Sequence, residues 1–164
     1  MLKASGIVPD VAFTSVLRRA QRTLQLCCRE ASLPDLPTAV SWRLNERHYG
    51  GLTGLNKAET EAQHGAAQLH AWRRSYATPP PPVEKGSAHD PRSDPKYDHL
   101  PDDLIPAGES LALTRARVSP YWHQVGGWVG RSISFCCHER KKKKEHGIIL
   151  VSKLPQSFFF FSRP

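Results

Sequence analysis

A short apolar segment followed directly by a helical one constrains the fold of this chain most. Val11–Ser15 is a run of five mostly apolar residues, of the kind that forms a buried parallel strand. Ser15 is placed to cap a helix through residues 18–26, and Thr38–Leu44 is a plausible second strand. A strand followed directly by a helix is half of a βαβ unit, so the sequence predicts an α/β fold.

Two further helices are expected in the middle of the chain. Alanine, leucine and tryptophan recur at near-helical spacing over Lys57–Ser75, and Asn56 is placed to cap this helix. Residues 79–82 are all proline and must be extended, and residues 83–106 form a long polar, proline-rich excursion. The apolar spacing over Glu109–Trp122 predicts the next helix.

The charge of the chain is unevenly distributed. The net charge is +8, yet residues 1–122 hold 15 Lys and Arg against 13 Asp and Glu, a net of +2. Residues 123–164 hold 8 against 2, a net of +6, and half of these cations are the run Lys141–Lys144. Such a run binds phosphate backbones without specificity, and no nucleic-acid-binding motif accompanies it, so we expect no nucleic-acid partner.

The tail from His123 onward differs from the rest in composition. It contains the lysine run and Phe158–Phe161, with no sustained hydrophobic period. We therefore divide the chain into a domain at residues 1–122 and an unrelated basic, low-complexity tail at residues 123–164, which we expect to be disordered. A retained intron or a frameshift is our leading hypothesis for the tail.

Several classes of protein are excluded by pattern. No apolar run approaches the ~20 residues that span a bilayer, and the N-terminus has no signal-peptide pattern, so we expect a cytoplasmic protein without a membrane partner. The four cysteines form two adjacent pairs, Cys27–Cys28 and Cys136–Cys137. This spacing is not that of a zinc site, and we expect no metal.

Five of the basic residues in two segments rich in glycine, proline and aromatic residues, and on the helix before them, form a candidate set for binding an anion. Arginine suits phosphates and carboxylates because its planar fork binds two oxygens and stays charged. The segments are Ser41–Thr60 and Trp72–Pro82. The cations are Arg19, Arg47, Lys57, Arg73 and Arg74.

These two segments resemble the substrate-binding insert of the 2,3-bisphosphoglycerate-dependent phosphoglycerate mutases, members of the histidine phosphatase superfamily. The alignment needs no insertion or deletion from Arg19 to Arg74. The resemblance implies the three-layer α/β fold of that superfamily. It also implies a cytoplasmic isomerase of glycolysis, which interconverts 3-phosphoglycerate and 2-phosphoglycerate by phosphoryl transfer. Its cofactor would be 2,3-bisphosphoglycerate, and a homo-oligomer is left open.

The resemblance assigns roles to eight residues. Glu46 corresponds to the catalytic acid/base that exchanges a proton with the substrate hydroxyl. The substrate-binding residues that it implies are Arg19, Arg47, His48, Tyr49, Lys57, Arg73 and Arg74.

The resemblance covers roughly residues 1–122. The phosphate-accepting histidine of the family follows its first strand, which would lie before Met1. The second active-site histidine has only a chance match here, at His146–Gly147, because an apolar strand does not precede it. We therefore expect an incomplete, truncated form that lacks the first strand, with an exposed sheet edge, and lacks the phosphohistidine.

Two alternatives stay open beside the mutase. One is a catalytically dead binding or interaction protein for phosphorylated three-carbon acids, which would use the same basic residues. The other is a bisphosphoglycerate mutase, a close sibling in the same family. The pair Gly50–Gly51 resembles the glycolytic mutases more closely.

Overall fold

A computed structural model of the chain describes residues 8–129, 133–135 and 148–151, with side chains up to Val125. Two compact units are present. The first contains residues up to Glu46 together with those from Pro120 onward, and the second contains Arg47–Ser119. Within the described ranges, no helix is both long and apolar enough to cross a membrane.

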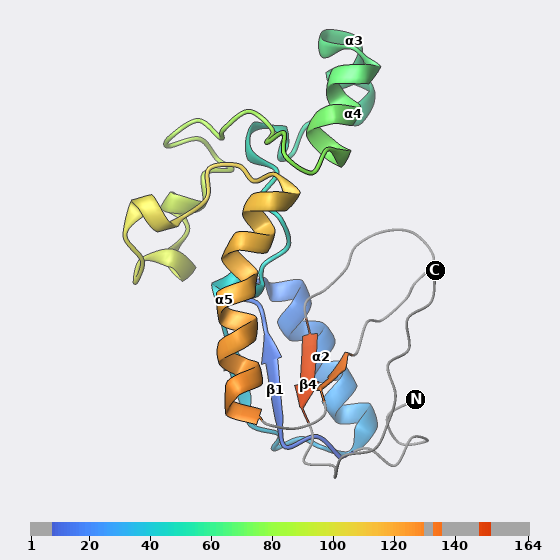
Figure 1. Cartoon of the computed structure of the whole chain (residues 1–164), viewed down its shortest axis with the longest axis vertical. Coiled ribbons are helices and arrows are strands. Elements are labelled where there is room, and N and C mark those ends of the chain that lie inside the picture. Colours follow the sequence, from blue (N-terminus) through green and yellow to red (C-terminus); the bar gives the residue numbers. More distant parts are fainter. Residues whose placement is uncertain (1–7, 130–132, 136–147, 152–164) are drawn as a thin grey trace. The chain divides into compact units, whose positions relative to one another are not determined.

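A four-stranded sheet forms the centre of the first unit, in the order β2-β1-β4-β3 (Figure 1). β1 (Val11–Thr14) pairs in parallel with β2 (Thr38–Val40), with Ala12 opposite Thr38. β4 (Ile148–Val151) pairs antiparallel with the other edge of β1, and β3 (Ile133–Phe135) pairs antiparallel with β4. The predicted parallel strand pair is therefore present.

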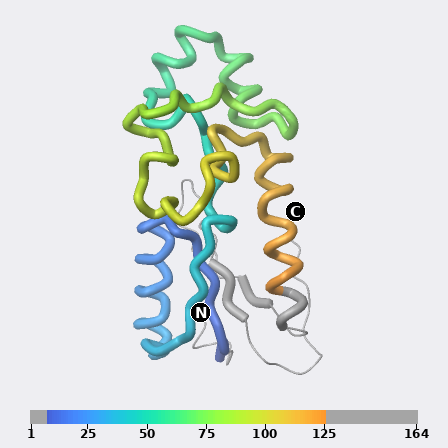
Figure 2. Tube along the Cα trace, turned by 90° about the vertical axis from the view of Figure 1, so that its left-hand side faces the viewer, coloured from blue at the N-terminus to red at the C-terminus, as the bar shows by residue number. Residues whose placement is uncertain are grey.

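Helices cover both faces of β1, because successive side chains of a strand point to opposite faces. On one face, Ala12 is buried against Leu24 of α2 (Arg18–Ala31). The cluster on the other face consists of Val11, Phe13, Leu44, Tyr121, Trp122 and Val125. Figure 2 shows β1, α2 and β2 running side by side. The arrangement of helix, sheet and helix confirms the predicted α/β class.

The turn between β1 and α2 differs in detail from the prediction. α2 begins at Arg18, its N-cap is Leu17, and no side chain caps it. Ser15 lies too early to act as the cap, and its Oγ accepts a hydrogen bond from the Leu17 N–H (3.3 Å). The second strand ends at Val40, and a 3₁₀ turn, η1 (Trp42–Leu44), follows it.

The C-terminal tail contributes two strands, and here the structure differs from the expectation of a disordered tail. Ile148–Val151 is a run of β-branched and apolar residues, which favours a strand. It pairs with the edge of β1 that we expected to be exposed. The remainder of the tail beyond Val129, including His146–Gly147 and the lysine and phenylalanine runs, lies outside the described residues.

Two short helices open the second unit. The predicted helix over Lys57–Ser75 is broken into α3 (Lys57–His64) and α4 (Ala66–Arg74). Gly65 separates them at φ +80°, a backbone conformation that a helix cannot contain. The predicted cap is confirmed, since Asn56 Oδ1 accepts from the Ala58 N–H (2.9 Å).

The rest of the second unit consists of short turns and the start of a long helix. The turns are η2 (Gly50–Leu52), η3 (Pro91–Ser93), η4 (Pro95–Tyr97) and η5 (Asp102–Leu104). α5 (Leu111–Val129) is longer than predicted and includes Pro120. Its residues up to Ser119 belong to this unit, and Ser110 Oγ accepts from the Leu113 N–H at its first turn.

A buried carboxylate holds the proline-rich excursion. Asp90 accepts hydrogen bonds from the Gly86 N–H (2.7 Å), the Arg92 N–H (3.1 Å) and Arg92 Nε (2.7 Å). The hydrogen bond from Arg92 is the main cause that lowers the pKa of Asp90, to about 2. One side chain therefore satisfies three donors and caps η3, the 3₁₀ turn that follows it.

Candidate functional site

The predicted acid/base lies in the first unit, beside a cation. Arg19 is in the first turn of α2, and its Nη2 donates to Glu46 Oε2 at 2.6 Å. The Arg19 side chain is 44% exposed and that of Glu46 is 19% exposed. Because the pair is partly exposed, it adds little to the stability of the fold. The Glu46 carboxylate also remains in contact with solvent.

The topology explains why these two residues meet. Arg19 follows the end of β1, and Glu46 follows the end of β2 after the η1 turn. Asn45 joins the two connections, because its Oδ1 accepts from the Val16 N–H at 3.3 Å. Parallel strands bring their carboxyl ends to the same edge of a sheet, which is where α/β proteins commonly place ligand-binding residues.

A second group of predicted residues lies in the second unit. Arg47 is buried, and its Nη2 donates to the Arg73 carbonyl oxygen at 2.8 Å. Both guanidinium groups lie near the ring of Tyr49, at 4.7 Å for Arg47 and 5.8 Å for Arg73. The electron-rich face of an aromatic ring attracts cations at these distances. Tyr49 therefore holds two arginines close together.

Two donors of this cluster are buried without a partner among the described residues. They are Arg47 Nη1 and Arg73 Nε. Burying a polar donor without a hydrogen bond is costly, and more so for a charged group. Two guanidinium groups with unused donors match the oxygens of a phosphate or carboxylate. By this test the cluster fits a phosphate or carboxylate anion.

His48 stands between these residues and is kept neutral. Burial lowers the pKa of His48 to about 4, and the charges of Arg117 and Lys96 act in the same direction while Glu109 opposes them. Its Nε2 is also buried without a hydrogen bond among the described residues. The ring lies 6.4 Å from that of Tyr97. At neutral pH His48 cannot contribute a positive charge to an anion site.

The backbone of this loop is fixed by close contacts that only glycine permits. Gly50 has φ +57°, and a Cβ there would overlap the Pro81 carbonyl oxygen and lie 3.0 Å from the Ala107 oxygen. The neighbouring Gly51 N–H donates to the Pro81 oxygen at 2.8 Å. The extended prolines therefore lie directly against the loop that follows Tyr49.

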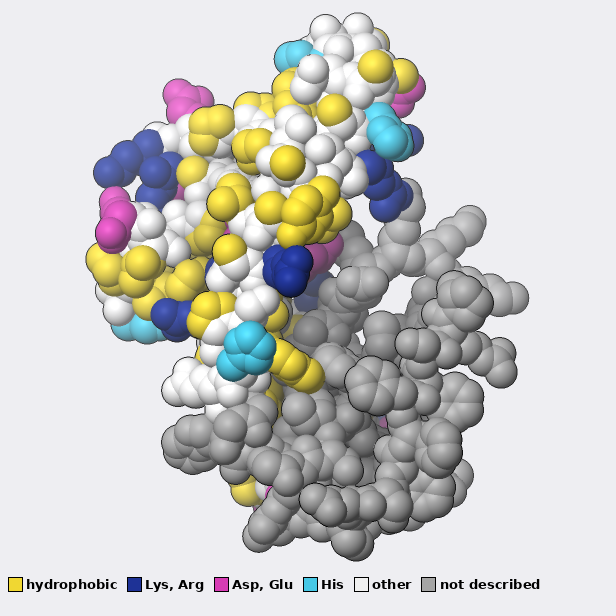
Figure 3. Space-filling view, in the orientation of Figure 1, with side chains coloured by type: hydrophobic (Ala, Val, Ile, Leu, Met, Phe, Trp, Pro, Cys, Tyr) yellow, Lys and Arg dark blue, Asp and Glu magenta, His cyan; other side chains and the backbone are white. Residues whose placement is uncertain are grey.

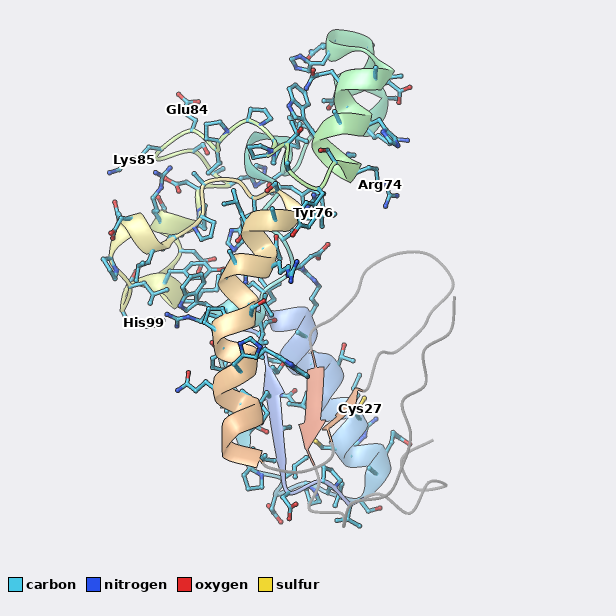
Figure 4. All side chains as sticks on the ribbon, viewed as in Figure 1. Cys27, Arg74, Tyr76, Glu84, Lys85 and His99 are labelled. Carbon is cyan, nitrogen blue, oxygen red and sulfur yellow. The ribbon has the colours of Figure 1, made fainter. Side chains whose placement is uncertain are left out.

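Two predicted residues are not joined to either group. Lys57 and Arg74 are exposed, and in the described part of the chain no hydrogen bond or ion pair links them to the other predicted residues. Arg74 projects from the end of α4 (Figure 4). On the face seen in Figure 3, basic side chains of the described residues stand in separate groups among apolar and acidic ones.

Two residues beside the second group were not singled out from the sequence. Glu109 and Arg117 form a buried ion pair, with side chains 3% and 6% exposed, that contacts the His48 backbone. Their spacing of eight residues would correspond to about 12 Å along a helix, which is too far for the spacing to predict a pair. Nothing in the sequence signals the contact with His48, 61 positions away.

The described residues contain no group of three or more His, Cys, Asp and Glu side chains arranged to hold a metal ion. The polar chemistry of both groups is that of guanidinium donors, one carboxylate and one neutral imidazole.

Comparison with known proteins identifies the family. The family model of the histidine phosphatase superfamily, branch 1, matches residues 3–104. This match spans more than half of the chain, so the chain belongs to the histidine phosphatase superfamily.

Within that superfamily, the chain is similar to proteins named 2,3-bisphosphoglycerate-dependent phosphoglycerate mutase. That of Zymomonas mobilis subsp. mobilis is 55% identical over 123 residues, 75% of this chain and 53% of the relative. That of Erythrobacter litoralis is 52% identical over 122 residues, 74% and 52% of the two chains. That of Nitratidesulfovibrio vulgaris is 53% identical over 125 residues, 76% and 50%. The chain spans about half the length of these curated relatives.

Replacing Gly50 by alanine tests the close approach at the loop. Gly50 and Gly86 both have positive φ, but nothing lies within 4 Å of a Cβ at Gly86. Gly86→Ala is expected to cost about 1–2 kcal/mol from its backbone conformation alone. Gly50→Ala should cost about 1–3 kcal/mol more, because the chain must shift away from Pro81. Urea unfolding of both variants measures the difference, and equal losses of stability would refute the close contact.

The pKa of His48 predicts how stability depends on pH. The unfolded chain binds a proton at His48 near the ordinary pKa of 6.5, and the folded chain only near 4. The folded state therefore binds fewer protons in this window, and stability decreases as the pH falls from 6.5 to 4, by at most about 3 kcal/mol. NMR titration of the imidazole should give a pKa near 4. His48→Gln should flatten the pH dependence of urea unfolding, and an unchanged dependence would contradict the assignment.

Proposed function

We propose that this chain is the phosphoglycerate-recognising part of a 2,3-bisphosphoglycerate-dependent phosphoglycerate mutase. Such an enzyme interconverts 3-phosphoglycerate and 2-phosphoglycerate in glycolysis, in the cytoplasm. We further propose that the phosphohistidine of such an enzyme is not among the described residues of this chain. The single observation that carries the proposal is the pair of arginines on Tyr49, each with a buried donor that is not used within the described chain.

The chemistry of the substrate explains why this pair supports the proposal. A phosphoglycerate carries one phosphate and one carboxylate, so it needs fixed cations that reach several oxygens. Arg47 and Arg73 offer planar forks held at the same ring, and their unused donors would become satisfied by anionic oxygens. Lys57 and Arg74, which are exposed, would add positive charge without a fixed partner.

Glu46 would supply the acid/base step. Its carboxylate is positioned by Arg19 at 2.6 Å and remains 19% exposed, so it can exchange a proton with a hydroxyl group in solvent reach. A positioned carboxylic acid contributes on the order of 10²–10⁴-fold to such a step. When bound, 2,3-bisphosphoglycerate supplies the phosphoryl group, and Arg47, Tyr49 and Arg73 are the residues that would hold its phosphates.

A binding protein without catalysis is the second candidate. The observation that favours it is the composition of the two groups of site residues. They contain guanidinium donors, which bind anions, and beside these they contain Glu46 and one histidine. That histidine, His48, has its Nε2 enclosed and its backbone held by Glu109. A bisphosphoglycerate mutase would use the same binding residues, and turnover distinguishes the three functions.

Calorimetric titration of the full chain with 3-phosphoglycerate tests the binding claim. We expect Arg73→Met to weaken binding at least about tenfold, because it removes charged hydrogen bonds worth roughly 1.5–3 kcal/mol. Arg73→Lys keeps the charge and loses the fork, so its affinity for 3-phosphoglycerate should lie between those of the wild type and Arg73→Met. Arg29→Met is the matched control, because it removes one positive charge from an exposed side chain of α2 that pairs with its neighbour Glu30. Equal affinities of the wild-type and Arg73→Met proteins would refute the arginine site.

A coupled mutase assay with added 2,3-bisphosphoglycerate separates the candidates that bind. Turnover that is abolished by Glu46→Gln supports the mutase. Net formation of 2,3-bisphosphoglycerate supports the bisphosphoglycerate mutase. Binding of 3-phosphoglycerate without turnover of either kind supports the catalytically dead binding protein and excludes the mutase activity of this form.

A further inference from the structure

Glu109 and Arg117 form an ion pair in the second unit that is bonded at both carboxylate oxygens. Arg117 Nε donates to Glu109 Oε1 at 2.6 Å, and Arg117 Nη2 donates to Oε2 at 2.8 Å. This is the two-point fork of a guanidinium on a carboxylate, which fixes direction as well as distance. Both side chains are almost fully buried, at 6% and 3% exposed.

The same carboxylate holds the backbone of His48. Glu109 Oε2 accepts from the His48 N–H at 2.9 Å, and the Glu109 N–H donates to the His48 carbonyl oxygen at 2.8 Å. Both backbone polar groups of one residue are therefore bonded to a single partner. His48 stands between Arg47 and Tyr49, so fixing its backbone restricts the residues on either side.

The loop from Arg47 to Gly51 is held by hydrogen bonds on two sides. On one side is Glu109, held by Arg117 from the second turn of α5. On the other side is Pro81, whose oxygen accepts from the Gly51 N–H. Arg117 is linked to the loop through Glu109, which in turn bonds to the His48 backbone.

We propose that Glu109 and Arg117 are positioning residues for the Arg47–Tyr49–Arg73 anion site, which they order by clamping the His48 backbone. This inference rests on the proposed function, because it assigns a cause to the geometry of that binding site. The clamp keeps the two guanidinium groups at one ring before the anion arrives, so less freedom is lost on binding. Loosening it should weaken binding without removing any group that touches the ligand.

The charges of the pair have a consequence for pH. Burial raises the pKa of Glu109, but the hydrogen bonds and charge of Arg117 and the His48 N–H outweigh it and hold the pKa below its usual value. The carboxylate therefore stays ionised, and the clamp stays closed, across the neutral range. The groups that face it are Arg117 on α5, which begins two residues after Glu109, and His48.

Glu109→Gln in the full chain is the test, because glutamine keeps the shape and one acceptor and loses the charge. We expect affinity for 3-phosphoglycerate to fall on the order of 10-fold to 100-fold, as a displaced site commonly does. Amide hydrogen exchange at His48 should become faster than that of the rest of the unit. Arg117→Lys keeps the charge and loses the fork, so it should lower the affinity less and accelerate the exchange of the His48 amide less. This variant replaces Glu109→Gln in the test if Glu109→Gln does not fold.

Asp90→Asn is the matched control. Asp90 is also a buried carboxylate that accepts from an arginine and from backbone N–H groups of the same unit, and it does not bond to His48. It should lower stability and leave the affinity and the His48 amide unchanged. The positioning role would be overturned if the wild type and Glu109→Gln bound 3-phosphoglycerate equally well. It would also be overturned if Asp90→Asn lost as much affinity as Glu109→Gln. Either result would leave the proposed function intact. Absence of binding by the wild-type chain would overturn the proposed function itself.

Discussion

The buried ion pair of Glu109 and Arg117 is the interaction that holds the His48 backbone, and with it the proposed anion site of the second unit. A carboxylate taken out of water must have its oxygens bonded, and here three donors meet that need. Removing one partner from such a pair typically costs about 3–5 kcal/mol, since the other charge is left buried. The pair therefore links α5 to the His48 backbone.

The pair of Arg19 and Glu46 shows the opposite use of the same chemistry. It is short, at 2.6 Å, but both side chains are partly exposed. Solvent screens such pairs, and they contribute roughly 0–1 kcal/mol to stability. A residue that exchanges protons with a substrate has to change partners at low cost. The acid/base role proposed for Glu46 fits an exposed pair, and the positioning role proposed for Glu109 fits a buried one, because burial sets how costly a change of partner is.

The sheet of the first unit shows how a short strand becomes buried on every side. β1 has helices against both faces and a paired strand at each edge. The strand at the second edge is β4, from a segment whose composition gave no sustained period around it. Unpaired edges recruit extended segments, and an apolar run of four residues is sufficient to pair with a strand of equal length.

The sequence alone determined the strand–helix–strand order of the first unit, the cap at Asn56 and the set of cationic residues, because these depend on local propensity and side-chain chemistry. It could not determine the break at Gly65, the full length of α5, or the partner of β4. Nor could it bring Glu109 to His48, since that contact spans 61 positions and forms only when loop and helix pack. Which cations share a ring, and which remain exposed, was decided by the tertiary structure, because burial and long-range contacts have no local signal.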